Sequence, residues 1–104
     1  MRITNIAFLR AKTGREAALG DLLIELAELS RGEPGCVEYA LHQSPDAPSL
    51  WFVYENWRSE QDLESHFRTI HMRRFAQASA ALMDGEMKLG LFEPVTAARE
   101  LRAA

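Results

Sequence analysis

The sequence predicts an α+β domain whose elements follow the order β-α-β-β-α(α)-β. Apolar, β-branched and aromatic residues dominate residues 2–10, 36–42 and 50–57, which is typical of strands. Leucines at helical spacing lie between the first two of these segments. Two N-cap patterns and a last apolar run, residues 88–95, follow the third. This is the ferredoxin-like order, and its four strands are expected to form one antiparallel sheet.

The first helix is expected from about residue 14 to residue 31. Thr13 and Glu16 have the spacing of a capping box. Glu33, Pro34 and Gly35 end the helical pattern. Its apolar stripe consists of Leu19, Leu22, Leu23, Leu26 and Leu29.

The second half of the chain predicts a hairpin and two helical segments. A turn at residues 44–49 joins the second and third strands, and Ser59 is expected to cap a short helix. Thr69 is expected to cap a further helix that ends at Asp84 and Gly85. In that helix we expect Met72, Phe75, Leu82 and Met83 to face inward and Arg73 and Arg74 to face outward. Residues 97–104 are expected to form a loose or helical extension.

Length and composition indicate one domain, residues 1–104, with a core at about residues 2–95 and an extension at 96–104. The net charge is −3 and no basic stripe is present, so neither nucleic acid nor membrane is an expected partner. A single cysteine, Cys36, cannot form an internal disulfide. Together with an N-terminus unlike a signal peptide, this favours a reduced, cytoplasmic location.

Several enzyme classes lack their motifs in this sequence. It has no GxGxxG, no GxxxxGK[ST], no GxSxG, no CxxC and no HExxH. A motif-borne nucleotide, flavin or metal cofactor is therefore not expected, and the predicted cofactor is none.

The predicted sheet carries apolar side chains on both faces, but the predicted helices can cover only one. An apolar face of that size indicates an interface. A homodimer that packs sheet to sheet is the expected solution.

Two stretches carry a resemblance to a known family. They are the run from Glu33 to Tyr39, EPGCVEY, and the run from Tyr54 to Trp57, YENW, which is followed by Leu63 and His66. With the capped leucine helix and Thr69 to His71, they resemble the antibiotic biosynthesis monooxygenase (ABM) family over residues 2–95. The resemblance implies a dimeric α+β barrel with a ligand cavity in each subunit, between sheet and helices.

The same resemblance implies several chemistries. Some members oxidise anthrones or quinols with O₂ and no metal, flavin or haem, others degrade haem, and one branch isomerises a phosphorylated autoinducer-2 signal. The isomerase branch resembles this sequence at residues 81–85, ALMDG, and at the last strand, residues 88–92, which carries Lys88 and Phe92. Haem is disfavoured, because the haem-degrading relatives place an aromatic residue at the position of His66 and a histidine near that of Ala76.

Asn5 and His66 are the expected catalytic residues. Asn5 offers hydrogen-bond donors to an oxyanion, and the alternative is an amide paired with backbone. His66 has the chemistry of a base that takes a substrate proton. His71 is expected to face solvent or to bond the helix cap, and converges with His66 only if the helix breaks at Thr69. Because no carboxylate lies at ligand spacing nearby, no metal site is expected.

Aromatic and thioether side chains are candidates for substrate binding, with ordinary core packing as the alternative. Alternation places Phe52 and Tyr54 on one face of their strand and Glu55 and Trp57 on the other. Glu55 is interpreted as structural, paired with an arginine across the dimer. The candidate binding residues are Tyr39, Phe52, Tyr54, Trp57, Phe67, His71, Met72 and Phe75.

The leading hypothesis is a cofactor-independent monooxygenase that oxidises a small electron-rich aromatic, of quinol or anthrone type, with O₂. One alternative is an isomerase of a small phosphorylated carbonyl compound, which needs Arg68, Arg73 or Arg74 at the phosphate. The other is a non-catalytic stress-response dimer that holds an apolar ligand.

Overall fold

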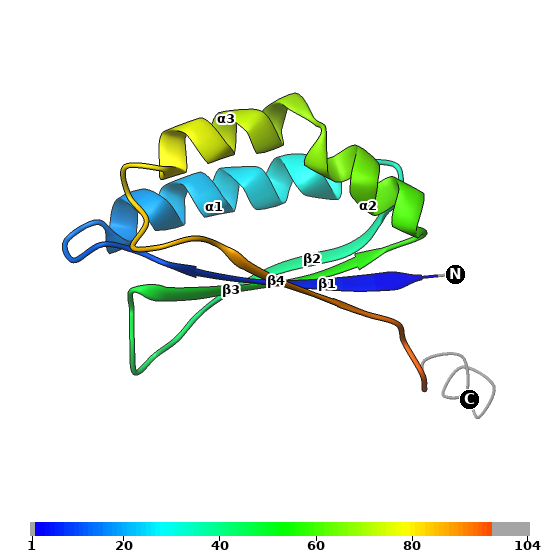
Figure 1. The fold of residues 1–104 in the computed structure, drawn as a ribbon, viewed down its shortest axis with the longest axis horizontal. Helices are drawn as coiled ribbons and strands as arrows, with labels where there is room; N and C mark the ends of the chain where they lie inside the picture. Colours follow the sequence, from blue (N-terminus) through cyan, green and yellow to red (C-terminus); the bar gives the residue numbers. More distant parts are fainter. Residues whose placement is uncertain (1, 97–104) are drawn as a thin grey trace.

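The computed structural model describes residues 2–96, and its elements follow the predicted order (Figure 1). The fold is α+β and ferredoxin-like, with one four-stranded antiparallel sheet. Residues 97–104, the predicted extension, lie outside the described residues. The elements are β1 (Ile3–Arg10), α1 (Glu16–Arg31), β2 (Cys36–Gln43), β3 (Leu50–Trp57), α2 (Glu60–Phe67), α3 (Ile70–Ser79) and β4 (Lys88–Phe92).

The sheet has the strand order β2-β3-β1-β4, and all described helices lie on one face of it (Figure 1). Each strand pair is antiparallel. The register places Glu55 on β3 between Asn5 on β1 and Tyr39 on β2. Three polar side chains therefore come together on neighbouring strands, on the face that the helices cover.

The helix-covered face holds the core. Side chains at alternate positions of β1 and β3 are buried there, and Leu19, Leu23 and Leu26 of α1 cover them as predicted. Leu29, the last residue of the predicted stripe, is exposed instead. Gly20 allows close packing, because a Cβ at this position would come within 2.8 Å of the Trp51 ring. The apolar core residues of these three elements are Ile3, Ala7, Leu9, Leu19, Leu23, Leu26, Ala27, Trp51, Val53 and Trp57.

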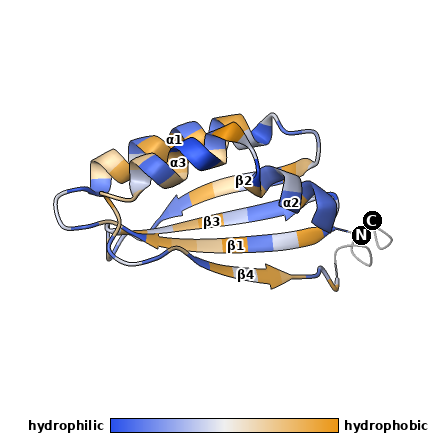
Figure 2. Cartoon of the chain, turned by 45° about the horizontal axis from the view of Figure 1, so that its top comes forward, coloured by the Kyte–Doolittle hydropathy of each residue, from blue (hydrophilic) through white to orange (hydrophobic). Residues whose placement is uncertain are grey.

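The opposite face of the sheet is open and partly apolar. Phe8 stays 44% exposed and Phe92 55% exposed, while Phe52 and Tyr54 are half-buried. In Figure 2, apolar colour runs along much of β4, the edge strand that pairs with β1. The prediction of an apolar face without helices is confirmed for the residues that the structure describes.

The predicted capping box of the first helix is wrong. α1 begins at Glu16 instead of residue 14, and its N-cap, Arg15, makes no side-chain capping bond. The reason is Gly14, whose φ of +85° turns the chain before the helix starts. Thr13 is thereby separated from the helix that it was expected to cap.

Two other boundaries also differ from prediction. α3 ends at Ser79 and not at Asp84, because backbone groups of the next turn bond the segment after β1: Lys12 N–H donates to the Leu82 carbonyl at 2.8 Å. β4 ends at Phe92 instead of residue 95.

The break between α2 and α3 is the local feature that matters most for the site. Ser59 and Thr69 cap their helices as predicted, each accepting a backbone N–H three residues on. The Thr69 hydroxyl also donates to the His66 carbonyl at 2.8 Å. Thr69 therefore ties the end of one helix to the start of the next.

Among residues 2–96, no helix has the length and apolar composition that a membrane crossing requires.

Candidate functional site

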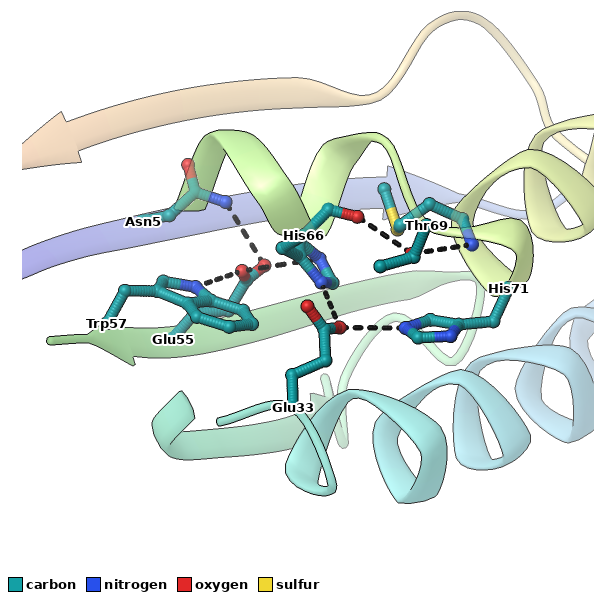
Figure 3. Close-up of polar contacts among 8 residues, drawn as sticks. Asn5, Glu33, Glu55, Trp57, His66, Thr69 and His71 are labelled. Carbon is teal, nitrogen blue, oxygen red and sulfur yellow. Dashed lines mark hydrogen bonds and ion pairs between the residues drawn. The ribbon is translucent and has the colours of Figure 1, made fainter. Parts of the chain in front are cut away.

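The candidate site lies at one end of the helix-covered sheet face, where ionisable side chains replace the apolar core (Figure 3). Asn5 and Glu55 come from paired strands, and His66 reaches them from the last turn of α2. Each of the three is buried.

Glu55 is held by two donors. Asn5 Nδ2 donates to its Oε2 at 3.1 Å, and Trp57 Nε1 donates to its Oε1 at 2.9 Å. Burial nevertheless raises the pKa of the Glu55 carboxyl from 4.5 to about 7, against the lowering effect of those two bonds. Its partners lie within the same chain, so the predicted arginine across the dimer is not needed to pair it.

His66 stands between two carboxyl groups. Its Nδ1 is 2.7 Å from Glu33 Oε2, and its Nε2 is 3.8 Å from Glu55 Oε1. The ring packs against the indole of Trp57, with ring centroids 4.5 Å apart. Burial lowers the pKa of His66 although Glu33 acts to raise it, so the neutral imidazole is favoured near neutral pH.

Glu33 also contacts a second histidine, His71. His71 Nε2 lies 2.7 Å from the same Glu33 Oε2 that His66 contacts. The helix break at Thr69 lets both histidines reach this carboxylate, which comes from the turn after α1. The expectation that no carboxylate lies near them is therefore wrong. Glu33, His66 and His71 each offer one ligand atom, all within 4.8 Å of one another, and are the residues here that could hold a metal ion.

Asn5 does not present its amide as expected. Its Nδ2 is engaged with Glu55, whereas its buried Oδ1 has no hydrogen-bond partner. An unpaired buried carbonyl costs about 1–3 kcal/mol. The alternative of an amide satisfied by neighbouring backbone therefore does not hold for this oxygen.

A small cavity brings the predicted catalytic residues together. It has a volume of about 10 Å³, room for one water molecule, and no lysine or arginine lines it. Of the predicted binding residues, Tyr39, Phe67, Met72 and Phe75 line it, beside Asn5, Glu55 and His66. Four leucines, Ala7 and Val53 form most of the remaining wall.

The other predicted binding residues lie elsewhere. Phe52 and Tyr54 are on the open face of the sheet, because strand alternation turns them away from Glu55. Trp57 supports Glu55 and His66 from the core side. His71 lines a separate groove between α1 and α3.

An apolar groove of about 380 Å³ adjoins the cavity on the α3 side. Met72, Phe75 and Met87 line both spaces. Thioether side chains change rotamer at little cost, so rearrangement of the two methionines would join the groove to the cavity.

Sequence patterns do not reveal two contributors, which are Glu33 and the role of Glu55. Strand parity already places Glu55 on the same face as Val53 and Trp57, and a carboxylate among buried apolar residues is a sign of a functional site. No local pattern connects Glu33 with His66, because 33 residues separate them.

Comparison with known proteins supports one family. The model of the family described as antibiotic biosynthesis monooxygenase matches residues 2–78. PA3566 from Pseudomonas aeruginosa, a solved structure, is 34% identical, with a TM-score of 0.85 and coverage of 90% of this chain and 94% of that one. Rv0793 from Mycobacterium tuberculosis shares the fold at 23% identity and a TM-score of 0.85, with coverage of 91% and 96%.

A curated relative, the uncharacterised protein sll1783 from Synechocystis, is 27% identical over 66 residues. That alignment covers 64% of this chain and 45% of the relative, so the match spans less than half of the relative's length. The family model covers most of the residues that build the sheet, the first two helices and the polar site. The chain belongs to the antibiotic biosynthesis monooxygenase family.

Proposed function

We propose that this protein is a monooxygenase that oxidises a small electron-rich aromatic, of the quinol or anthrone class, with O₂ and without an electron-transferring cofactor. The observation that carries the proposal is the meeting of His66, Glu55 and an unpartnered Asn5 oxygen in one otherwise apolar cavity. Such a substrate supplies the electrons itself once a proton has been removed from it. The protein then needs a base, a means of orienting the substrate and a dry wall.

His66 is the proposed base. With the Nδ1 proton donated to Glu33, the Nε2 atom of the neutral ring carries the free lone pair. Nε2 faces Glu55 at 3.8 Å, so an imidazolium formed by proton transfer would lie beside a carboxylate on each side. Glu55, with a pKa of about 7, shares the accepted proton and acts with His66 as one proton-accepting pair.

Asn5 is proposed to orient the substrate. Its free Oδ1 accepts a hydrogen bond from a substrate hydroxyl, and its Nδ2 keeps Glu55 in place. The deprotonated substrate passes one electron to O₂, and recombination gives a peroxy product. Loss of water from that product leaves one oxygen atom in the oxidised aromatic and the other in water.

The described cavity is too small for an aromatic ring, so the substrate must displace side chains on binding. The Met72 and Met87 boundary with the 380 Å³ groove is the proposed route. We further propose that the working form is a homodimer, in which the open sheet face around Phe8, Phe52 and Phe92 packs against a second copy.

The alternatives find less support in the geometry. An isomerase of a phosphorylated substrate needs a cation at the phosphate, whereas none lines the cavity and Arg68, Arg73 and Arg74 are all exposed. A passive site for an apolar ligand gives no reason to bury Glu55 and His66.

The experiment is oxygen uptake by chelator-treated, flavin-free protein with a panel of reduced quinols and anthrones. We expect uptake above the rate of spontaneous oxidation, and about 100- to 10,000-fold lower kcat/KM in His66→Gln. His42→Gln is the matched control, because His42 lies on β2 beside Phe52, on the sheet face opposite the cavity, and the same variant checks that the proposed dimer face tolerates the change. Absence of uptake across the panel, or equal rates in His66→Gln and the wild type, would exclude the proposed reaction.

A further inference from the structure

We propose that Glu33, His66 and His71 form a binding site for a divalent first-row transition-metal ion of the Zn²⁺ type. Their ligand atoms lie within 4.8 Å of one another, and each residue comes from a different segment: the turn after α1, the end of α2 and the start of α3. This site goes beyond the proposed oxidation and is an alternative state of the same ring, because an ion on His66 Nδ1 leaves the proton on Nε2, the atom proposed as the base. The oxidation is therefore expected of the metal-free protein, and metal binding is expected to oppose it.

The donor set is the first argument. Two imidazole nitrogens and one carboxylate oxygen suit zinc and its neighbours in the first transition row. Such ions bind these ligands at about 2.0–2.2 Å, which places two ligands on a tetrahedral ion about 3.3 Å apart. Both histidine nitrogens now lie 2.7 Å from Glu33 Oε2. Each histidine nitrogen must therefore move about half an ångström away from Glu33 Oε2 to admit an ion, and the two histidine nitrogens, which lie within 4.8 Å of each other, must reach the same spacing of about 3.3 Å.

The group behind His66 is the second argument. Histidine ligands usually donate their other ring N–H to a carboxylate, a backbone carbonyl or water, which fixes the tautomer and the ring orientation. Glu55 Oε1 lies 3.8 Å from His66 Nε2, on the side of the ring away from Glu33. A metal on Nδ1 would move the ring proton to Nε2, and Glu55 Oε1 would accept it once the 3.8 Å separation closes to hydrogen-bond distance. Asn5 and Trp57 hold Glu55 in that position.

Local preorganisation is the third argument. Thr69 caps α3 and bonds the carbonyl of His66, so it fixes the turn that orients both histidines. Buried side chains are expensive to reposition, and His66 is only 1% exposed. His71 and Glu33 retain 19% and 12% exposure of their side chains, so an ion has access from solvent.

A groove of about 110 Å³ between α1 and α3 adjoins His71 and leaves space for further ligands such as water. Three protein ligands with an open position are a common arrangement for Zn²⁺. A redox-inert ion here would join three segments and fix the His66 ring without supplying electrons.

The test is titration of the chelator-treated 104-residue chain with Co²⁺, followed by visible absorption, and with Zn²⁺ in competition with a chelator of known affinity. We expect one ion per chain, and at least about 100-fold weaker binding in Glu33→Gln and in His71→Gln. Glu55→Gln should weaken binding about 10-fold, because Glu55 acts only through His66.

Glu25→Gln and His42→Gln are the matched controls. Glu25 lines the groove beside His71 but lies outside the three-residue cluster, and His42 is an exposed histidine on β2. Both should bind within about twofold of the wild type. Circular dichroism verifies the fold of each variant, and His71→Gln alters a partly exposed side chain.

Two outcomes would overturn the site. One is no uptake of Co²⁺ by the folded wild type at millimolar concentration. The other is equal binding by the wild type and the folded His71→Gln variant. Binding is measured without substrate or oxygen, so its outcome is independent of the oxidation assay.

Discussion

The two ends of the helix-covered sheet face differ in what they bury. At the β1 C-terminal end the buried side chains include the apolar residues Leu9, Trp51 and Leu19, and Gly20 lets the indole approach the helix. At the other end the same two strands carry Asn5 and Glu55. Burial of apolar area stabilises the first end, whereas burial of a carboxyl group costs free energy at the second. Along the strands of one sheet, the residues at one end therefore mainly stabilise the fold, and the residues at the other end form the candidate site.

The largest effect on stability is expected at the apolar end. Leu19→Ala removes a fully buried side chain under the helix and should lower the free energy of unfolding by about 2–5 kcal/mol. Urea unfolding at neutral pH measures it. Ile24→Ala on the same helix is the control, because Ile24 is 51% exposed and should change little. Equal losses in the two variants would remove the distinction between core and surface on α1.

Glu55→Gln should raise the free energy of unfolding at high pH, whereas Leu19→Ala lowers it. The native carboxyl has its pKa raised from 4.5 to about 7, so the unfolded chain loses this proton first as the pH rises. Wild-type stability therefore falls between these two pH values, by about 3 kcal/mol from this group, and the penalty persists above pH 7. Burial of neutral His66 has the opposite effect on protein stability. Because burial lowers the pKa of His66, its contribution to the free energy of unfolding increases as the pH rises toward the ordinary histidine pKa.

The difference between Glu55→Gln and the wild type isolates the carboxyl. We expect it to increase in favour of the variant by about 3 kcal/mol between pH 4.5 and pH 7.5, measured by urea unfolding at each pH. Glu38→Gln, an exposed carboxyl on β2, should show no such trend. A pH-independent difference for Glu55→Gln would mean that burial does not raise this pKa.

Asn5→Leu tests the donor that holds Glu55. Loss of the bond from Nδ2 to Oε2 should raise the pKa of Glu55 by roughly a further unit, equivalent to about 1.4 kcal/mol. Carbon-13 NMR titration of the Glu55 carboxyl measures this directly. Asn56→Leu is the neighbouring control, because Asn56 bonds Thr4 and Tyr54 on the opposite sheet face. A similar titration in both variants would assign Asn5 no part in holding Glu55.

The smallest effect is expected at the helix break. Thr69→Ala removes the cap of α3 and the bond to the His66 carbonyl, which should cost about 1 kcal/mol in thermal unfolding. Thr13→Ala should cost close to nothing, because the N-cap of α1 has no side-chain bond. If Thr13→Ala lowered the stability by more than Thr69→Ala does, Thr13 would cap α1 after all, contrary to the structure.

The element order could be predicted from the sequence because periodicity and capping are local properties. The Leu stripe, Ser59 and Thr69 each act within a few residues. The capping box predicted at Thr13 is not formed, because Gly14, with a positive φ, lies between Thr13 and the helix. A capping pattern in the sequence carries no information on that angle. The end of α3 depends on backbone bonds to a segment about 70 residues away, between Lys12 and Leu82.

The site could be predicted only in part. Asn5 and His66 stand out as polar residues within apolar patterns, and the cavity unites them. Glu55 follows from strand parity once a carboxylate on the buried face is given weight. Glu33 does not, because its contacts with His66 and His71 cross 33 and 38 residues and exist only after the helices pack.

The turn that carries Glu33 has a consequence for how tolerant this fold is of change. Gly35 lies so close to the side chain of Asp62 that a Cβ would overlap it, so the turn rests directly on the start of α2. This contact with the Asp62 side chain, together with the Arg58 N–H that donates to the Gly35 carbonyl at 2.8 Å, holds the turn that carries Glu33 against the segment leading into α2. A methyl group at position 35 would act as a wedge, displacing the carboxylate from both imidazoles while every ionisable side chain kept its identity. Relatives with a bulkier residue there would need a different route for this loop before they could assemble the same cluster.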